Sequence, residues 1–160
     1  IVEEANIDLP VTAFIPADWI IDQDQKLIAY KAASECMSIE NLIELTITWK
    51  DRYGDIPNPV QALIQVMKLK IKAKQCGISR IKVIKPNIVL ETKMSKSSFE
   101  ALRKAIPSSS NSRFIYKQGD KVAEIVIRGI GNLDVNRLIE QLIEWLDLIV
   151  AYIEASDVFD

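Results

Sequence analysis

The segment 38–53 carries a hydrophobic pattern that fits two different periods. Its stretch "IELTITW" alternates between apolar and polar residues, which is the pattern of a strand. Taken at 100° per residue, the segment instead separates into an apolar face and an acidic face. The apolar face comprises Leu42, Leu45, Thr46, Trp49 and Tyr53, and the opposite face comprises Glu40, Glu44, Thr48 and Asp51. Because no turn signal precedes the stretch, the pattern predicts a helix that is capped by Ser38 and runs to Tyr53.

Another helix is predicted on the N-terminal side of this segment. The first stretch, "IDLPVTAFIPADWI", is extended in character because Pro10 and Pro16 exclude a helix and β-branched residues lie between them. Asp22 or Asp24 can cap the helix that follows. The apolar side of that helix is expected to comprise Leu27, Tyr30, Ala33 and Met37.

A third helix is predicted after a sharp stop. Gly54 supplies a left-handed end to the second helix, and Asn58 with Pro59 supplies a cap and a first helical residue for the third. This helix is expected to end at Gly77 and to bury Val60, Leu63, Ile64, Met67 and Ile71. Its lysines at positions 68, 70, 72 and 74 lie in two rows beside the apolar stripe, which predicts a solvated helix whose lysine stems lie along the surface.

The hydrophobic period changes to two after residue 77. The stretch "ISRIKVIKPNIVLETK" predicts a hairpin that turns at 85–87, and "RFIYKQGDKVAEIVIRG" predicts a second hairpin that turns at 118–120. Between them, Ser97 and Glu100 have the spacing of a capping box for a helix that ends at Ile106. From Asn132 a long helix is predicted to about Ala155, with an apolar stripe of Val135, Leu138, Ile139, Leu142, Leu146, Ile149 and Ile153.

This order of elements predicts an α+β fold with N-terminal helices, a small antiparallel sheet built from two hairpins, and a long C-terminal helix. A chain of 160 residues with 49% hydrophobic residues can bury a core as a single domain, 1–160. The longest strongly apolar run, "LIVAYI", is far shorter than the roughly 20 residues that cross a bilayer. The first residue is Ile, which suggests a domain excised from a longer protein. Cys36 and Cys76 are expected to be buried, reduced thiols of a cytoplasmic protein.

Candidate chemistry is sparse in this sequence. The chain has no histidine, which removes the usual general base and the commonest zinc ligand. The stretch "GIGN" lacks the third glycine of a dinucleotide fingerprint, and "DQDQK" lacks the glycine and distal Glu of a calcium loop. Ser79 and Lys82, at Ser-x-x-Lys spacing, would face opposite ways in a strand. We therefore expect no catalytic residues, no cofactor and no metal.

The net charge of −2 conceals a segregation along the chain. Residues 1–60 carry 4 basic and 11 acidic side chains, residues 61–128 carry 15 and 4, and residues 129–160 carry 1 and 7. The fold can either interleave these blocks or present separate acidic and basic surfaces. The basic block could contact phosphates, so a basic-patch nucleic-acid-binding module remains an alternative function. Its three aromatic residues, however, are expected in the core, where they cannot stack on bases.

Four segments carry a resemblance to a known family. These are "FIPADWI" (14–20), "KLIAYKAAS" (26–34), "DRYGDIPNPVQALI" (51–64) and "KLKIKAKQCGI" (68–78). In this order and spacing they resemble the C-terminal regulatory domain, or TRCF domain, of the bacterial transcription-repair coupling factors (the Mfd family). The usual forms there are close to "YIPDDYI" and "DRFG-x-x-P-x-P". The match is specific over residues 7–80 and weaker beyond.

The resemblance implies a regulatory role in transcription-coupled DNA repair. Members of this family are ATP-dependent DNA translocases that displace stalled RNA polymerase and recruit the excision-repair protein UvrA through a UvrB-like N-terminal module. Their C-terminal domain is not catalytic. It packs on the UvrB-like module and hides the surface that recruits UvrA, so it is autoinhibitory. Its partners are therefore the intramolecular module and, through the parent protein, UvrA, RNA polymerase and DNA, with no membrane.

The resemblance also points to partner-binding residues at the end of the second helix. Asp51 matches an acidic position that meets basic residues of the module. The family commonly has a second acid three residues earlier, where this chain has Thr48, so the contact is expected to shift toward Glu44. Arg52 and Asp55 complete the predicted partner-binding set.

Overall fold

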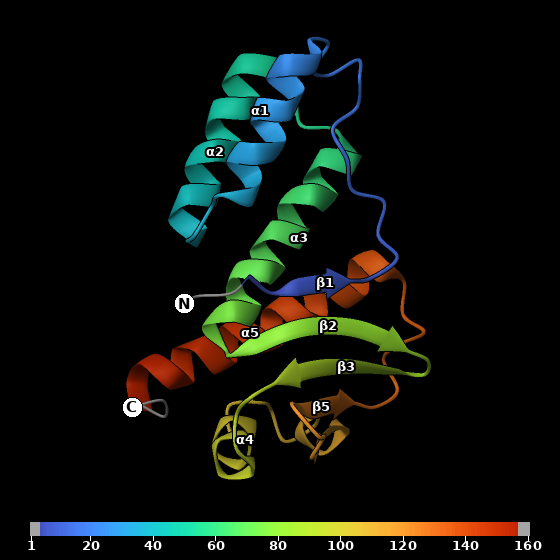
Figure 1. The fold of residues 1–160 in the computed structure, drawn as a ribbon, viewed down its shortest axis with the longest axis vertical. Helices are drawn as coiled ribbons and strands as arrows, with labels where there is room; N and C mark the ends of the chain where they lie inside the picture. Colours follow the sequence, from blue (N-terminus) through green and yellow to red (C-terminus); the bar gives the residue numbers. More distant parts are fainter. Residues whose placement is uncertain (1–3, 157–160) are drawn as a thin grey trace.

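Residues 4–156 are described by a computed structural model. The helices are α1 (Gln23–Ser34), α2 (Ile39–Tyr53), α3 (Asn58–Gln75), α4 (Lys96–Arg103) and α5 (Val135–Ser156), and a short 3₁₀ turn (Asn111–Arg113) precedes β4. The strands are β1 (Asn6–Asp8), β2 (Ile78–Ile84), β3 (Asn87–Thr92), β4 (Phe114–Lys117) and β5 (Ala123–Ile127). In Figure 1, α1 and α2 form one end of the molecule, and α3 leads from that end to the sheet. The α+β fold class is confirmed.

The helical interpretation of segment 38–53 is confirmed by α2. Ser38 is the N-cap, and its hydroxyl accepts a hydrogen bond of 3.1 Å from the backbone N–H of Asn41. Leu42 and Trp49 are buried on the predicted apolar face. Asp22 caps α1 in the same way, accepting a 2.9 Å hydrogen bond from the N–H of Gln25. In both helices a short polar side chain satisfies a backbone donor that has no intrahelical partner.

Two predicted caps are wrong. Helix α3 begins at Asn58 with Pro57 in the cap position and no side-chain cap, so Pro59 is the second helical residue. This is tolerated because the first N–H groups of a helix have no intrahelical acceptor to lose. Helix α4 is capped by Ser95, whose hydroxyl accepts from the N–H of Ser98 at 3.1 Å. Helix α4 thus starts at Lys96, before the predicted cap Ser97, and ends at Arg103, before the predicted Ile106.

The predicted apolar side of α1 is also wrong in part. Leu27 and Met37 are each 66% exposed, and Met37 lies beyond the end of the helix. The helix instead packs through Ala29 and Ala33, which are buried, and the Tyr30 hydroxyl accepts a 2.7 Å hydrogen bond from the N–H of Ile15. The large apolar residues Leu27 and Ile28 of this helix are exposed instead.

Helix α3 is a central helix rather than a solvated one. Leu69 and Ala73 are buried in the cluster formed with the sheet and α5, while Val60 and Leu63 are buried in the cluster formed with α1 and α2. Lys72 is only 8% exposed and pairs with Asp147 of α5, so the prediction of surface lysines fails at this position. The sequence shows one apolar stripe along α3, and one stripe predicts a helix that is buried on one side only. Because α3 is covered on two sides, this pattern could not indicate its central position.

The sheet has five strands in the order β1-β2-β3-β5-β4. Both predicted hairpins are present, as β2–β3 and β4–β5, and every pairing except one is antiparallel. The exception is β1, which pairs parallel to β2 with Ile7 opposite Ile81. The sheet is therefore mixed. The extended N-terminal segment covers the edge of β2 that the hairpin leaves unpaired.

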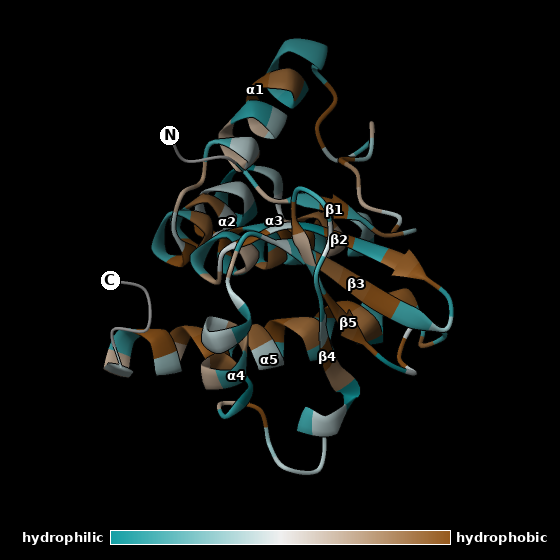
Figure 2. Cartoon of the chain, turned by 60° about the horizontal axis from the view of Figure 1, so that its bottom comes forward, coloured by the Kyte–Doolittle hydropathy of each residue, from teal (hydrophilic) through white to brown (hydrophobic). Residues whose placement is uncertain are grey.

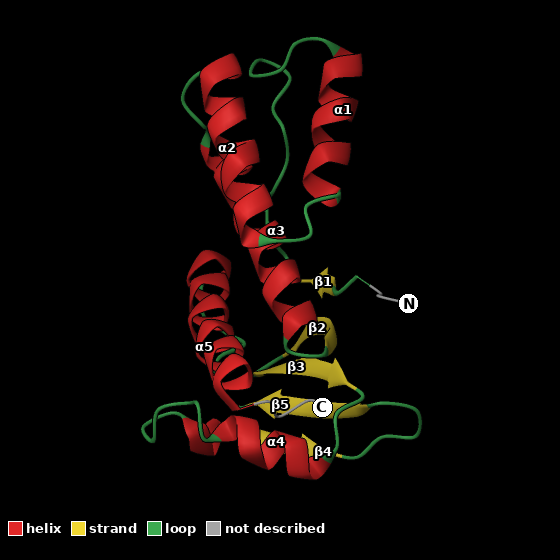
Figure 3. Cartoon of the chain, turned by 90° about the vertical axis from the view of Figure 1, so that its left-hand side faces the viewer, coloured by secondary structure: helices red, strands yellow, loops and turns green. Residues whose placement is uncertain are grey.

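The long C-terminal helix packs on the sheet as predicted. Its stripe residues Leu138, Ile139, Leu142, Leu146 and Ile149 are buried. Figure 2 shows apolar residues concentrated in β3, β5 and α5, and Figure 3 shows α5 running beside the sheet while α1 and α2 lie at the other end. The larger hydrophobic cluster therefore lies under α5, and α3 connects it to the smaller cluster of the helical end.

Candidate functional site

The end of α2 forms a braced corner. Gly54 ends the helix with a φ of 88°, a left-handed value that a side chain would disfavour, and its N–H donates to the carbonyl of Lys50 at 3.0 Å. The indole N–H of Trp19 donates to the carbonyl of Asp55 at 3.0 Å. The Trp19 ring also lies 5.3 Å from the Tyr53 ring and 6.0 Å from the Trp49 ring. The chain after α2 is thus held by a side chain from a distant segment.

The acidic face of α2 points to solvent. Glu40, Glu44, Thr48 and Asp51 are all exposed. Among residues 4–156, none of these carboxylates forms an ion pair. The helical repeat places Glu44 and Asp51 two turns apart on the same face. The face therefore presents negative charge that the fold itself does not neutralise.

The four predicted partner-binding residues do not all lie on that face. Glu44 and Asp51 do. The Arg52 guanidinium lies 5.5 Å from the centre of the Tyr53 ring, about 100° around the helix from Asp51. Asp55 follows the helix in the exposed loop, where its carbonyl is held by Trp19.

A shallow groove of about 600 Å³ opens beside this corner, between α2, α3 and α5. Its lining includes Thr46, Lys50, Asp55, Gln61, Gln65 and Glu140. The Gln61 amide donates to the carbonyl of Ile56 at 3.0 Å, which fixes the loop against the first turn of α3. The groove joins Asp55 to the side of α2 next to the acidic face, and its lining is mixed, because Ile56 and Ile64 lie among the polar side chains.

Sequence reasoning missed the brace. Trp19 fixes the loop at Asp55 from a position 36 residues earlier in the chain. The only signal in the sequence was an aromatic residue after Pro16 in the segment "FIPADWI". An aromatic residue in an extended segment indicates burial but not which loop it supports.

The charge blocks are partly interleaved. Arg80 pairs with Asp8 at 2.9 Å, Lys70 pairs with Glu4 at 3.4 Å, and Lys72 pairs with Asp147. Each of these pairs joins the basic block to one of the acidic blocks. Lys82 also lies 3.1 Å from Glu91 within the basic block. The sheet thus neutralises part of its own positive charge, whereas the acidic face of α2 stays uncompensated.

The buried thiol of Cys76 lies beside the Lys72–Asp147 pair. Its sulfur is 3.7 Å from the carbonyl of Leu146. Burial raises the pKa of this thiol to about 12, the charge of Lys72 lowers it, and that of Asp147 raises it. Such a thiol is a packing group rather than a nucleophile. Both cysteines are free, as predicted, but Cys36 is only half-buried.

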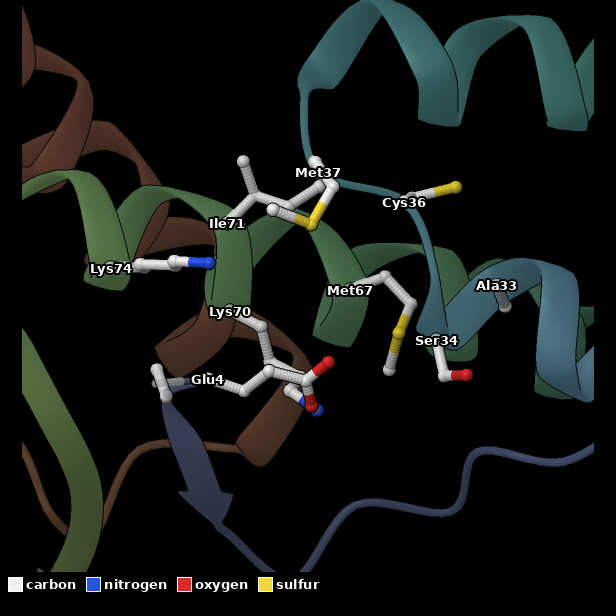
Figure 4. A pocket seen from close by; sticks show the side chains of 10 residues that line it. Glu4, Ala33, Ser34, Cys36, Met37, Met67, Lys70, Ile71 and Lys74 are labelled. Atoms are coloured by element: carbon white, nitrogen blue, oxygen red, sulfur yellow. The ribbon is translucent and has the colours of Figure 1, made fainter. Parts of the chain in front are cut away.

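A second hollow is lined in part by sulfur-containing side chains. It lies between the end of α1, the following loop and α3, and holds about 30 Å³, room for one water molecule. In Figure 4 the sulfur of Cys36 points away from the sulfurs of Met37 and Met67. Within residues 4–156, no three or more His, Cys, Asp or Glu side chains are grouped to hold a metal ion.

Two further sequence features have structural explanations. The Ser79 hydroxyl donates to the carbonyl of Glu91 at 3.2 Å, and Lys82 pairs with carboxylates, so the two do not act as a nucleophile and base. In the part of the chain that the structure describes, every helix is too short or too polar to cross a membrane.

Comparison with known proteins gives a consistent result. The sequence model of the TRCF domain matches residues 9–102. The transcription-repair-coupling factor of Staphylococcus haemolyticus is 24% identical over 160 residues, which cover 98% of this chain and 13% of that protein. That of Staphylococcus aureus (strain USA300) is 28% identical over 81 residues, 51% of this chain and 7% of that protein. The chain thus spans a small part of these curated relatives.

A solved structure shares the fold. The crystal structure of the C-terminal domain of transcription-repair coupling factor matches this chain with a TM-score of 0.79 at 18% sequence identity. The match covers 96% of both chains, so it includes the sheet and α5 as well as the helical end.

Proposed function

The chain belongs to the TRCF domain family, and from this premise we propose that it is a non-catalytic regulatory domain of a longer transcription-repair coupling factor. In the bacterial cytoplasm it docks on the UvrB-like module of its parent polypeptide through the acidic face of α2. In the docked state it masks the surface that recruits UvrA. The parent protein supplies the ATP-dependent translocation and the contacts with RNA polymerase and DNA.

The observation that carries this proposal is the exposed, uncompensated acidic face beside a braced corner. Glu44 and Asp51 present charge without partners among the described residues, and Trp19 holds the adjacent loop in one position. An exposed ion pair contributes only about 0–1 kcal/mol, while a charge pair desolvated at an interface can contribute several. A charged contact is thus strong enough to hold the domain on the module and weak enough to let the two separate.

A binding titration tests this function. The 160-residue chain is titrated against the UvrB-like module, supplied as a separate protein, at two salt concentrations. We expect saturable binding that weakens at high salt, and about tenfold or greater weakening by Asp51→Lys because a like charge then faces the basic partner. Glu44→Lys should add to the effect.

Glu154→Lys is the matched control, since Glu154 is also an exposed acid in the last turn of a helix. It should bind like the unaltered chain. Binding that is absent, or that is indifferent to salt and to Asp51→Lys, would show that the acidic face is a solvated surface only.

A further inference from the structure

Exposed apolar side chains are concentrated at the helical end of the molecule. Of the eleven large hydrophobic side chains that are most exposed among residues 4–156, seven lie between residues 14 and 47. Two of them, Ile43 and Ile47, are 54% and 62% exposed and lie one turn apart on α2. The sheet, the other half of the fold, has few such residues. Isolated exposed isoleucines are ordinary, but a pair on one helix face is an apolar strip.

This strip is continuous with the acidic face. The helical repeat places Ile43 between Glu40 and Ile47, and it places Ile47 between Glu44 and Asp51. Ile43 thus has a carboxylate three residues before it, and Ile47 has carboxylates three residues before it and four residues after it. Lys50, on the far side of the strip from the acids, leads into the groove beside α3 and α5. The strip is therefore flanked by acids on one side and by a groove on the other.

We propose that Ile43 and Ile47 form the apolar centre of the docking surface, and that the partner is a patch of the parent polypeptide with an apolar centre and a rim of arginine or lysine. This inference rests on the proposed function and identifies the chemistry of its partner. The acids set the sign of the rim, because the side chains that line one side of the strip are negative and form no ion pair within the described chain.

The parent polypeptide is the occupant favoured by chain length. In the Staphylococcus haemolyticus relative, the segment that matches this chain is 13% of the protein. A domain of this kind therefore has most of its parent available as a docking partner at high effective concentration. An intramolecular contact of this kind needs less buried area than a free complex, because the linkage has already lowered the entropic cost of association.

An apolar centre and a charged rim contribute to binding in distinguishable ways. Burying apolar surface gives a negative change in heat capacity that salt barely affects. Charged contacts at the rim give a salt dependence and little heat-capacity change. The two contributions can thus be separated by varying temperature and salt in one calorimetric titration.

The test is isothermal titration calorimetry of the 160-residue chain against the UvrB-like module at several temperatures and two salt concentrations. The variants are Ile43→Ser/Ile47→Ser and Asp51→Lys. The control is Ile84→Ser, because Ile84 is an isoleucine of matching exposure, 53%, at the end of β2. Thermal unfolding of each variant confirms that the fold is retained.

We expect the double isoleucine variant to bind about tenfold or more weakly, with a smaller heat-capacity change and an unaltered salt dependence. Asp51→Lys should also weaken binding. In this variant, however, the salt dependence should become flatter and the heat-capacity change should stay the same. If Asp51→Lys weakens binding while the double isoleucine variant matches the unaltered chain, the inference is wrong and the proposed function stands. If Ile84→Ser weakens binding equally, the inference is also wrong. If the unaltered chain does not bind, the proposed function itself fails.

Discussion

At the scale of single residues, Asp51 occupies a position that is unfavourable for the helix it belongs to. It lies in the last turn of α2, where unpaired carbonyl groups leave a partial negative charge. A carboxylate there costs a few tenths of a kcal/mol. We therefore predict that Asp51→Ala or Asp51→Lys leaves the free energy of unfolding unchanged or raises it slightly. Denaturant unfolding of the isolated chain measures this.

The contrasting change is Trp49→Ala on the buried face of the same helix. The Trp49 side chain is buried and packs edge-on against Trp19. Its removal leaves a cavity and should lower the free energy of unfolding by about 3–5 kcal/mol. If Asp51→Lys instead destabilised the chain to a similar degree, Asp51 would be a structural residue and its role in docking would lose its support.

The second prediction at this scale concerns Cys76 and high pH. Its ordinary pKa of 9.0 is raised by burial to about 12 in the folded chain. As pH rises through this window, the unfolded chain loses the thiol proton while the folded chain keeps it. The unfolded state is therefore favoured, and the free energy of unfolding falls from about pH 9 upward. Below pH 9 both states are protonated and the thiol has no effect.

Comparison with Cys76→Ala isolates this effect, because all other titrating groups are shared. The variant should be destabilised at neutral pH by its small cavity. Between about pH 9 and 11, however, its free energy of unfolding should fall less steeply than that of the unaltered chain. Parallel curves over this range would mean that the thiol is accessible to water in the folded chain.

At the scale of elements, α3 couples the two hydrophobic clusters. Val60 and Leu63 belong to the cluster of the helical end, and Leu69 and Ala73 belong to the cluster under α5. Because one continuous helix contributes to both, unfolding either cluster removes the support of the other. We predict a single unfolding transition in which both clusters melt together.

The tryptophans allow this prediction to be measured. Trp49 is in the helical cluster and Trp145 is in the cluster under α5. In each variant that retains one of them as the fluorescent reporter, the midpoint seen by fluorescence should coincide with the midpoint seen by far-UV circular dichroism. Leu63→Ala and Leu69→Ala should each lower the midpoint seen by both reporters. Two separated transitions would show that the helical end and the sheet are independent units.

Most elements of the fold could be predicted from the sequence, because each carries its own period and punctuation. Helix α2 has a cap at Ser38 and a stop at Gly54, and both lie where predicted. The strand β1 could not be predicted, since three residues carry no period and their partner β2 is far away in the chain. Lys72 was assigned to the surface because a buried charge depends on its partner, Asp147, which is 75 residues away.

The candidate site likewise combines features that follow from the local sequence with features that depend on distant segments. The acidic face of α2 could be predicted because it follows from the helical repeat alone, and its residues are exposed. The brace by Trp19 and the groove beside Asp55 arise from contacts between separate segments, which no local pattern encodes. The helical repeat places Ile43 at the edge of the apolar face, and the repeat alone does not decide whether such an edge position is buried; the side chain is 54% exposed.

At the scale of the whole molecule, charge is distributed unevenly over the two ends. The helical end presents the acidic face of α2, and residues 78–128, which include both hairpins and α4, carry 11 of the 15 basic residues of the basic block. Several of these basic residues are already paired, among them Arg80 with Asp8 and Lys82 with Glu91. The remaining basic residues are spread over α3, α4, the strands and the loops between them.

The last prediction tests whether this positive charge serves nucleic acid. We predict weak or undetectable binding of duplex DNA at physiological salt, measured by fluorescence anisotropy of a labelled duplex. Phe99 and Phe114 are buried, and the Tyr116 hydroxyl donates to the carbonyl of Met94 at 2.8 Å, so none of the three aromatic residues of the basic block is free to stack on bases. The acidic helical end also repels phosphate.

At low salt, contacts with phosphates should become measurable, and affinity should then fall by roughly one log-log unit per contact as salt rises. A dissociation constant below about 1 µM at physiological salt would instead favour the nucleic-acid-binding function, since such affinity exceeds what non-specific phosphate contacts provide.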